Sequence, residues 1–470
     1  MEEQKFYDSE KIFHYAQGEN KLDKKNINSN QNKSVQNISI INTLININNN
    51  NIQLNPEKIN KEEKENNPLF QENISHKEED DNIFSIFNED NFKTHIGPKN
   101  INNINDSKEK IINKELEDKI QKLAKKIKIE LNNEYIEEIR IGFKSSEIGD
   151  YNYLNSLIQC LANLPDLLIF FKNNINLIKN IKKYPFTFTF FRLIENLKNN
   201  SPKSLKHNFN DFIAVVEHCF PFLKNNKNPV DLFNLIMSKL HEELNKENNK
   251  NKIDRKKVDQ TDLNEIIKNE IIYFNHNNDT FVSKLFNIFL KIETKCLKCN
   301  KSFYEMQNFI SFELDIIGTY QKYKKNTLTI NDCLTYYSTP INKNLICSLC
   351  NRHSQLTVRK NIFSPSNNLV FVLSHINPNE ENEMMKFKFY YEEILDITYY
   401  IDKKLVDIKT EYILIGVVAF SLDTKKFISF CRNIFDNIWM YYDEDKINEC
   451  NYDYIVNNSN PYILFYKMLE

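Results

Sequence analysis

Two Cys-x-x-Cys pairs constrain the fold of this chain more than any other feature of its sequence. Cys296 and Cys299 form one pair, and Cys347 and Cys350 form the other after 47 intervening residues. Two such knuckles can place four thiolates in a tetrahedron around Zn²⁺. Four unrelated buried cysteines are the alternative. We therefore expect residues 296–350 to form an arm of strands whose tip is held by a structural zinc ion.

The remaining cysteines and the N-terminus indicate a reducing compartment. The chain has nine cysteines, an odd number, and none of them precedes Cys160. Its first residues, MEEQKFYDSEK, are acidic and polar, unlike a secretory signal. Both observations argue against a secreted disulfide framework. Because no apolar run approaches the ~18 residues that a membrane span needs, we expect a soluble protein of the cytoplasm or the nucleus that does not contact membranes.

Composition excludes several classes of ligand. The 470 residues include 62 basic and 64 acidic side chains, for a net charge of −2, so the chain as a whole has no electrostatic footprint for nucleic acid. Only six residues are glycine, and no two of them are close enough to build a Gly-rich phosphate cradle. P-loop and Rossmann nucleotide sites are therefore excluded as local signatures.

The first hundred residues differ from the rest of the chain. Between Asn26 and Asn51, eleven of the 26 residues are asparagine, and charged stretches follow. Such a segment cannot bury enough apolar surface to offset its ordering entropy. We therefore expect residues 1–105 to form a disordered, Asn-rich tail.

A helix is predicted next, within residues 106–138. Asp106 and Glu109 have the spacing of a helix-capping pair. Apolar residues then recur at spacings of three and four from Ile112 to Ile127, which is the pattern of one helical stripe. We expect this amphipathic helix to pack on the following domain or on a partner protein.

Residues 139–470 predict a single α+β domain. Apolar spacing indicates helices over 154–164 and 232–244, and the charged, Asn- and Lys-rich residues 245–268 resemble an insertion. After Phe281 the pattern changes to strands. We expect these strands, mostly antiparallel, over 308–317, 368–373, 412–420, 427–432, 438–442 and 462–466.

The stretch Gly149-Asp-Tyr-Asn-Tyr-Leu-Asn-Ser-Leu-Ile-Gln-Cys-Leu161 resembles the first catalytic box of the ubiquitin-specific proteases. That box reads Gly-Asn-Thr-Cys-Tyr-Leu-Asn-Ser-x-x-Gln, and six of its residues match in register. The residues that match are Gly149, Tyr153, Leu154, Asn155, Ser156 and Gln159.

Further motifs extend the resemblance to this peptidase C19 family over about residues 139–470. They are Asp231-Leu-Phe with Leu240-His-Glu-Glu-Leu244, the two Cys-x-x-Cys pairs, and the strands at 369–375, 412–420, 439–443 and 462–466. The resemblance implies a papain-like fold with a helical thumb, an antiparallel β palm and zinc-ribbon fingers. It also implies ubiquitin, or a protein that carries ubiquitin, as the partner.

The position of the family's nucleophilic cysteine is Asn152 in this sequence. An amide is not a nucleophile, although asparagine is among the best N-cap residues, so we expect Asn152 to start a helix without doing chemistry. The nearest thiol, Cys160, lies more than two helical turns further on and is interpreted as core. The resemblance would place the oxyanion donor at Glu147, which cannot donate when ionised, or at Ser145 or Ser146 in a longer loop.

The general base of the family is also missing. Its histidine position is Lys426, and no histidine occurs after His375. We interpret Lys426 as a solvated charge because a lysine acts as a base only when burial strongly lowers its pKa. The third position of the triad is retained as Asp443, with no imidazole to orient. We interpret His375 and His241 as structural.

These departures favour a catalytically inactive pseudoenzyme of the ubiquitin system that binds ubiquitin or acts as a scaffold. One alternative is an active isopeptidase with an unrecognised thiol, and a second is a scaffold of the spliceosome, where inactive relatives share the fold. The tail and the helix that follows it are the segments expected to join a protein complex.

Overall fold

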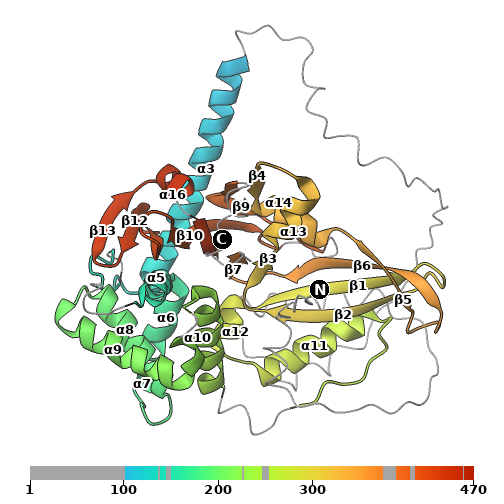
Figure 1. Cartoon of the computed structure of the whole chain (residues 1–470), viewed down its shortest axis with the longest axis horizontal. Coiled ribbons are helices and arrows are strands. Elements are labelled where there is room, and N and C mark those ends of the chain that lie inside the picture. The colour runs from blue at the N-terminus through green and yellow to red at the C-terminus, as the bar shows by residue number, and fades with distance from the viewer. Residues whose placement is uncertain are drawn as a thin grey trace, which may run out of the picture.

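The computed structural model (Figure 1) describes residues 101–470, apart from 136–137, 144–149, 225–226, 246–252, 374–387, 403–407, 459 and 470. The predicted tail, 1–105, therefore lies almost entirely outside the described residues. His375 and the oxyanion candidates Ser145, Ser146 and Glu147 also lie outside them.

A long helix, α3 (Ile101–Glu130), comes first, and its N-terminal half projects away from the rest of the structure (Figure 1). Because the helix begins at Ile101, Asp106 lies inside it and does not cap it as the sequence suggested. Its C-terminal half packs on the domain, where Ile120 and Leu123 are buried. The Lys119 ammonium pairs with the Glu411 carboxylate at 2.6 Å and ties the helix to the palm.

The helices between residues 152 and 244, together with α12, form the thumb (Figure 1). Four of the α-helices start with proline, which is favourable there because the first turn has no intrahelical acceptor for its N–H groups. The helices of the thumb are α5 (Asn152–Ala162), α6 (Pro165–Asn173), α7 (Ile175–Ile178), α8 (Pro185–Lys198), α9 (Pro202–Cys219), the 3₁₀ turn η3 (Pro221–Lys224), α10 (Pro229–Leu244) and α12 (Phe281–Phe286). The predicted helices at 154–164 and 232–244 correspond to α5 and α10.

The palm is an eight-stranded sheet in the order β13-β12-β11-β10-β14-β7-β3, with β9 paired to β10. Every pair is antiparallel except β3 with β7. The strands are β3 (Phe312–Leu314), β7 (Asn368–Leu373), β9 (Ile394–Asp396), β10 (Glu411–Ser421), β11 (Lys426–Asn433), β12 (Ile438–Asp443), β13 (Lys446–Cys450) and β14 (Asn460–Met468).

Both faces of the palm are buried, which explains its unbroken apolar strands. Along β10, Ile413 and Ile415 pack into the core that the thumb shares, while Tyr412 and Leu414 pack into a second core on the other face. That second core is closed by α13 (Ile316–Tyr323), β4 (Thr327–Thr329), α14 (Ile330–Ser338), β8 (Lys388–Tyr390), η5 (Thr398–Tyr400) and α16 (Tyr452–Asn458).

The fingers are a separate four-stranded sheet in the order β2-β1-β6-β5. Its strands are β1 (Ile288–Cys296), β2 (Ser302–Phe309), β5 (Ile341–Ile346) and β6 (His353–Ser364), and α11 (Leu263–Asn277) packs against β2. The predicted strand at 308–317 is wrong as one element, because β2 ends in the fingers, β3 joins the palm and α13 begins at Ile316. The segment interpreted as an insertion, 245–268, contains the first turn of α11, where Ile266 and Ile267 are buried.

Within the described residues, no single helix is long and apolar enough to span a membrane. Helices α5 and α6 reach the length and apolar composition of a membrane span only when they are taken together, and they meet at 74°.

Candidate active site and metal centre

The start of α5 is where the sequence places the nucleophile. The N-cap residue is Tyr151 and Asn152 is the first residue of the helix, so the expected capping role of Asn152 is wrong. Its side chain instead reaches the palm, because Asn152 Oδ1 accepts a hydrogen bond from the backbone N–H of Phe427 at 3.2 Å. Asn152 Nδ2 lies 3.5 Å from the Asp150 carboxylate. The amide at the nucleophile position is therefore a bond between thumb and palm.

Lys426 begins β11, next to the residue that Asn152 binds. Its ammonium pairs with Glu444 Oε1 at 2.6 Å, and the Glu444 side chain is only 10% exposed. This hydrogen bond, together with the negative charges of Glu444, Asp443 and Asp150, raises the pKa of Lys426. Lys426 is therefore a charged side chain, 37% exposed, that also has a partner the sequence did not reveal, and it cannot accept a proton at neutral pH.

Asp443 ends β12 and is buried. The structure places it within the electrostatic reach of Lys426 and directly before Glu444 in the chain. The positions of nucleophile, base and acid thus meet along one seam between α5 and the β11–β12 strands. We call this the thumb–palm seam and define it by Asn152, Lys426, Phe427, Asp443 and Glu444.

The thumb–palm seam is closed by close packing as well as by charge. Lys227, in the loop before α10, forms an ion pair with Asp150. On the palm side, a Cβ added to Gly142 would lie 2.0 Å from the backbone oxygen of Glu444, so only glycine fits there. No sequence motif pointed to Glu444, whose role depends on the β12–β13 turn that brings it back to Lys426.

The thiols outside the two knuckles are unsuited to nucleophilic attack. Cys160 is buried, and its Sγ lies 3.8 Å from the Sγ of Cys431 on β11. Burial raises the pKa of Cys160 well above its ordinary value, and it raises those of Cys333 and Cys450 to about 12. Burial also raises the pKa of Cys219. A raised pKa leaves little thiolate at neutral pH, which is the reverse of what catalysis needs.

His241 lies in α10, and its side chain contacts a neighbouring helix cap. Its Nδ1 lies 2.7 Å from Oγ1 of Thr280, the residue that caps α12. It therefore joins α10 to α12, consistent with the structural interpretation.

The four knuckle cysteines converge at the tip of the fingers. The sulfur atoms of Cys296, Cys299, Cys347 and Cys350 all lie within 4.8 Å of one another. Cys299 Sγ and Cys347 Sγ are 3.9 Å apart, close to the edge of about 3.8 Å that a tetrahedron with 2.3 Å zinc–sulfur bonds requires. This donor set fits a metal ion.

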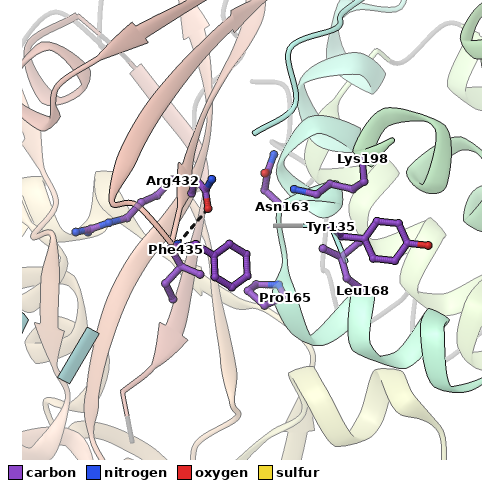
Figure 2. A pocket seen from close by; sticks show the side chains of 9 residues that line it. Tyr135, Asn163, Pro165, Leu168, Lys198, Arg432 and Phe435 are labelled. Atoms are coloured by element: carbon purple, nitrogen blue, oxygen red, sulfur yellow. Dashed lines mark hydrogen bonds between the residues drawn. The ribbon is translucent and has the colours of Figure 1, made fainter. Parts of the chain in front are cut away.

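Two other polar clusters lie away from the seam. A small pocket at the C-terminal end of α5 is lined by Lys198 and Arg432 among others (Figure 2), about 16 Å of helix from Asn152. Burial lowers the pKa of Lys198 to about 8. Its lining residues are Tyr135, Asn163, Pro165, Leu168, Lys198, Arg432, Asn433, Ile434 and Phe435.

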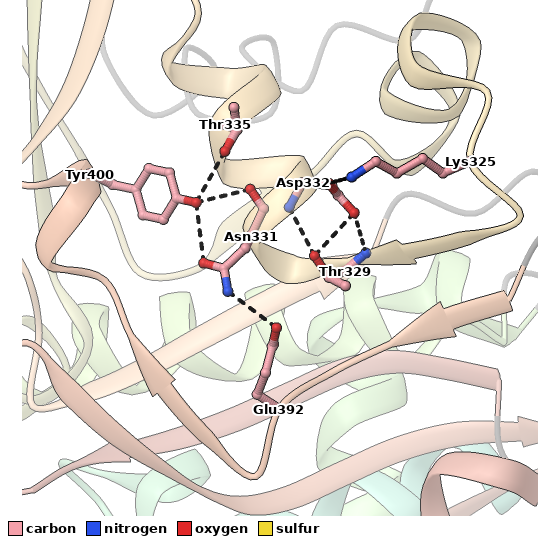
Figure 3. A network of polar contacts seen from close by, with 7 residues as sticks. All are labelled: Lys325, Thr329, Asn331, Asp332, Thr335, Glu392 and Tyr400. Atoms are coloured by element: carbon pink, nitrogen blue, oxygen red, sulfur yellow. Dashed lines mark hydrogen bonds and ion pairs between the residues drawn. The ribbon is translucent and has the colours of Figure 1, made fainter. Parts of the chain in front are cut away.

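The second cluster holds α14 in place (Figure 3). Thr329 and Asp332 form a capping box at the helix start. The Tyr400 hydroxyl donates to the backbone oxygen of Asn331 at 3.0 Å, and the Asn331 amide donates to Glu392 at 3.2 Å. Glu392 Oε2 is buried without a hydrogen-bond partner among the described residues, but the other members bind one another, so we assign the network to folding.

The fold is that of a thiol peptidase, with helices packed on an antiparallel palm and a separate finger sheet. The sequence profile of the ubiquitin carboxyl-terminal hydrolases matches residues 144–466, and the chain belongs to this family. The predicted family and its thumb, palm and fingers are thereby confirmed.

Solved structures of the same fold include the SAGA DUB module Ubp8/Sgf11/Sus1/Sgf73 bound to monoubiquitin, at 16% identity and a TM-score of 0.54 over 71% of each chain. The same module bound to ubiquitin aldehyde matches at 16% identity and a TM-score of 0.53, again over 71% of each chain. A yeast SAGA DUB module with mutant Sgf73 matches at 16% identity and a TM-score of 0.50, over 71% of this chain and 70% of that one.

Proposed function

We propose that this protein is a catalytically inactive member of its family that binds ubiquitin and acts as a scaffold. One observation carries the proposal: the position of the nucleophile is an amide, Asn152, whose oxygen is bound to the palm backbone at Phe427. Acyl transfer by this fold needs a thiolate, a base and an oxyanion donor that act as one unit. Neither Asn152 nor the paired Lys426 can supply the first two.

An active isopeptidase with another nucleophile is the competing function. It would need a thiol near the seam with a lowered pKa. Cys160, on the same helix, is buried and has a raised pKa, so the structure supports the inactive form.

Binding of ubiquitin is supported by the retained palm and fingers. Two of the similar structures hold ubiquitin or its aldehyde, and all three are assemblies with further subunits. We infer the same kind of partner here, and we assign contacts with other subunits to the tail and the projecting half of α3. We also propose that the metal held by the four cysteines is Zn²⁺, because four thiolates in a tetrahedron favour it.

The family threads the Gly-Gly tail of ubiquitin through a narrow channel beside the general base. Here Lys425, Lys426 and Phe427 replace the small residue at that place, and the bond from Asn152 crosses the seam. We expect the globular body of ubiquitin to bind without its tail, with a dissociation constant on the order of 10 μM or weaker.

The test is a titration of the full chain with intact ubiquitin and with ubiquitin that lacks its last two glycines. We expect the two dissociation constants to agree within about twofold, whereas a tail seated in a channel contributes tenfold or more, equivalent to about 1.4 kcal/mol. A large loss on truncation would show that the channel is open. Absence of binding to either form would refute the ubiquitin partner itself.

A double variant, Asn152→Ala with Lys426→Gly, removes the cross-seam bond and the ion pair. It should gain dependence on the ubiquitin tail. Lys446→Gly, an exposed lysine on β13, is the matched control and should leave the binding unchanged.

A further inference from the structure

The outer strand of the fingers, β5, is unusual among the strands of this protein. All six of its residues, Ile341–Ile346, are exposed. Three are large and aliphatic: Ile341 is 49% exposed, Leu345 51% and Ile346 59%. Leu297 in the first knuckle, 54% exposed, donates its backbone N–H to Gln355 on the neighbouring strand. Because side chains alternate along a strand, Ile341 and Leu345 share one face of β5 and Ile346 lies on the other.

The two edges of the finger sheet differ in what covers them. At the β2 edge, the backbone N–H of Tyr304 donates to the oxygen of Gln260 at 2.9 Å, and α11 packs alongside. At the other edge, β5 pairs with β6 on one side, and in the described ranges no strand pairs with its outer side (Figure 1). A bare edge of this kind presents unpaired backbone groups on which another strand can be added.

The charge around β5 has one sign. Residues 295–302 and 341–360 contain seven lysines and arginines and neither aspartate nor glutamate. The seven are Lys295, Lys298, Lys301, Lys343, Arg352, Arg359 and Lys360. Within the part of the chain that the structure describes, Lys343, Arg352 and Arg359 form no ion pair. Even four thiolates around a divalent cation, with a net charge of −2, leave the tip of the fingers positive.

We propose that β5 is a docking edge for an extended, acidic segment of a partner protein, which adds to the finger sheet as a fifth strand. Backbone hydrogen bonds would supply the pairing, Ile341 and Leu345 the apolar contacts on one face, and Lys343 with its basic neighbours the selection for carboxylates. This surface is the outer edge of the finger sheet and does not include the thumb–palm seam.

Two other occupants fit less well. A second copy of the chain that paired antiparallel through β5 would bring two copies of Lys343 close together, and like charges across a strand pair are unfavourable. A nucleic acid would be attracted by the charge, but the exposed large side chains at this edge are aliphatic and offer no aromatic platform for bases.

The test measures binding of fluorescent peptides to the full chain. The probe is the peptide Glu-Ile-Asp-Val-Glu-Ile-Asp, compared with the same peptide N-methylated at alternate residues and with its charge-reversed counterpart, in which lysine replaces each acid. We expect only the unmethylated acidic peptide to bind, and we expect it to slow amide hydrogen exchange in residues 341–346. Lys343→Glu and Leu345→Asp should each weaken this binding at least tenfold.

Lys446→Glu is the matched control, because it reverses an exposed lysine on β13, the edge strand of the palm sheet, and should leave the peptide affinity unchanged. Metal content and melting temperature establish that each variant is folded. The proposal is overturned if the acidic peptide does not bind at about 1 mM, or if methylation or Lys343→Glu leaves its affinity unchanged. It is also overturned if Leu345→Asp converts a dimer to a monomer, or if a single-stranded oligonucleotide binds in place of the peptide.

Discussion

At the scale of single residues, the seam shows how a catalytic position can be reused for structure. Asn152, at the proposed nucleophile position, accepts a hydrogen bond from Phe427 N–H, and Lys426, at the proposed base position, pairs with Glu444. Each of these side chains therefore forms an interaction that would have to be broken before the position could take part in catalysis. Restoring one residue therefore leaves the other partnership in place.

We accordingly predict that repair fails one residue at a time. The wild type and Asn152→Cys should show no turnover, since the new thiol would have no imidazole to deprotonate it, and Asn152→Cys with Lys426→His should show at most a trace. Release of a fluorophore from a ubiquitin C-terminal amide measures turnover, and a ubiquitin probe with a C-terminal electrophile reports on the thiol. Steady turnover by the unmodified protein, abolished by replacing one cysteine outside the two knuckles, would contradict the inactive assignment.

A second residue, Glu243, has a structural task that its motif did not reveal. It is buried, and its carboxylate accepts the backbone N–H groups of Phe186 and Thr187 at 3.1 and 2.9 Å and the Thr187 hydroxyl at 2.9 Å. Because these N–H groups belong to the first turn of α8, Glu243 on α10 caps a neighbouring helix.

Glu243→Ala should lower the free energy of unfolding by about 2 kcal/mol or more, because it leaves buried donors without an acceptor. Its neighbour Glu242 is the control: it is exposed and pairs with Lys239 at 2.8 Å, so Glu242→Ala should change stability by about 0.5 kcal/mol or less. Urea unfolding of both variants measures the difference. Equal losses would show that the cap contributes nothing specific.

At the scale of elements, the tip of the fingers has a core separate from that of the palm. The metal ligands pack with Leu356 in a small cluster of their own, while β10 and β14 belong to the two large clusters of the palm. Hydrogen bonds hold each knuckle, from Cys296 N–H to the Lys301 oxygen and from Cys347 N–H to the Arg352 oxygen, both at 3.0 Å. Further bonds tie the first knuckle to β6, such as Leu297 N–H to the Gln355 oxygen at 3.1 Å.

Metal removal should therefore loosen the fingers and leave the palm folded. Chelation is expected to speed amide hydrogen exchange in residues 295–302 and 345–356 but not in β10 or β14. Elemental analysis of the untreated protein should find one zinc per chain. Zinc-free protein whose four knuckle thiols react freely in the native state would contradict the assignment, and global unfolding on chelation would contradict the separation of the two cores.

At the scale of the whole molecule, the sequence predicted the palm well and the connections between elements poorly. Strands such as β10 and β14 are buried on both faces, so their apolar runs are long and unambiguous. The strand predicted at 308–317 failed because apolar residues continue across two sheets and into α13, and periodicity does not reveal where one layer ends. Ile266 and Ile267 were assigned to an insertion because charged neighbours mask the helical spacing of α11.

The sequence predicted which residues share the candidate site, but it did not predict which partners their side chains bind. The order of motifs placed Asn152, Lys426 and Asp443 at one site, and the structure brings them to one seam. The partner of Lys426 could not be predicted, because Glu444 is 18 residues away and reaches it only through the β12–β13 turn. The bond from Asn152 to a backbone N–H has no signature in the sequence at all.

The burial of α5 has a consequence for how such a protein can arise. Ten of its residues, Tyr153 to Ala162, are buried, whereas Asn152 at its tip accepts a hydrogen bond from the Phe427 backbone. Selection for a folded thumb and selection for a reaction therefore act on different residues of one helix. A lineage that does not need the reaction can therefore change the residue at the tip while the buried residues of the helix stay the same. Such a change leaves the fold intact at every step.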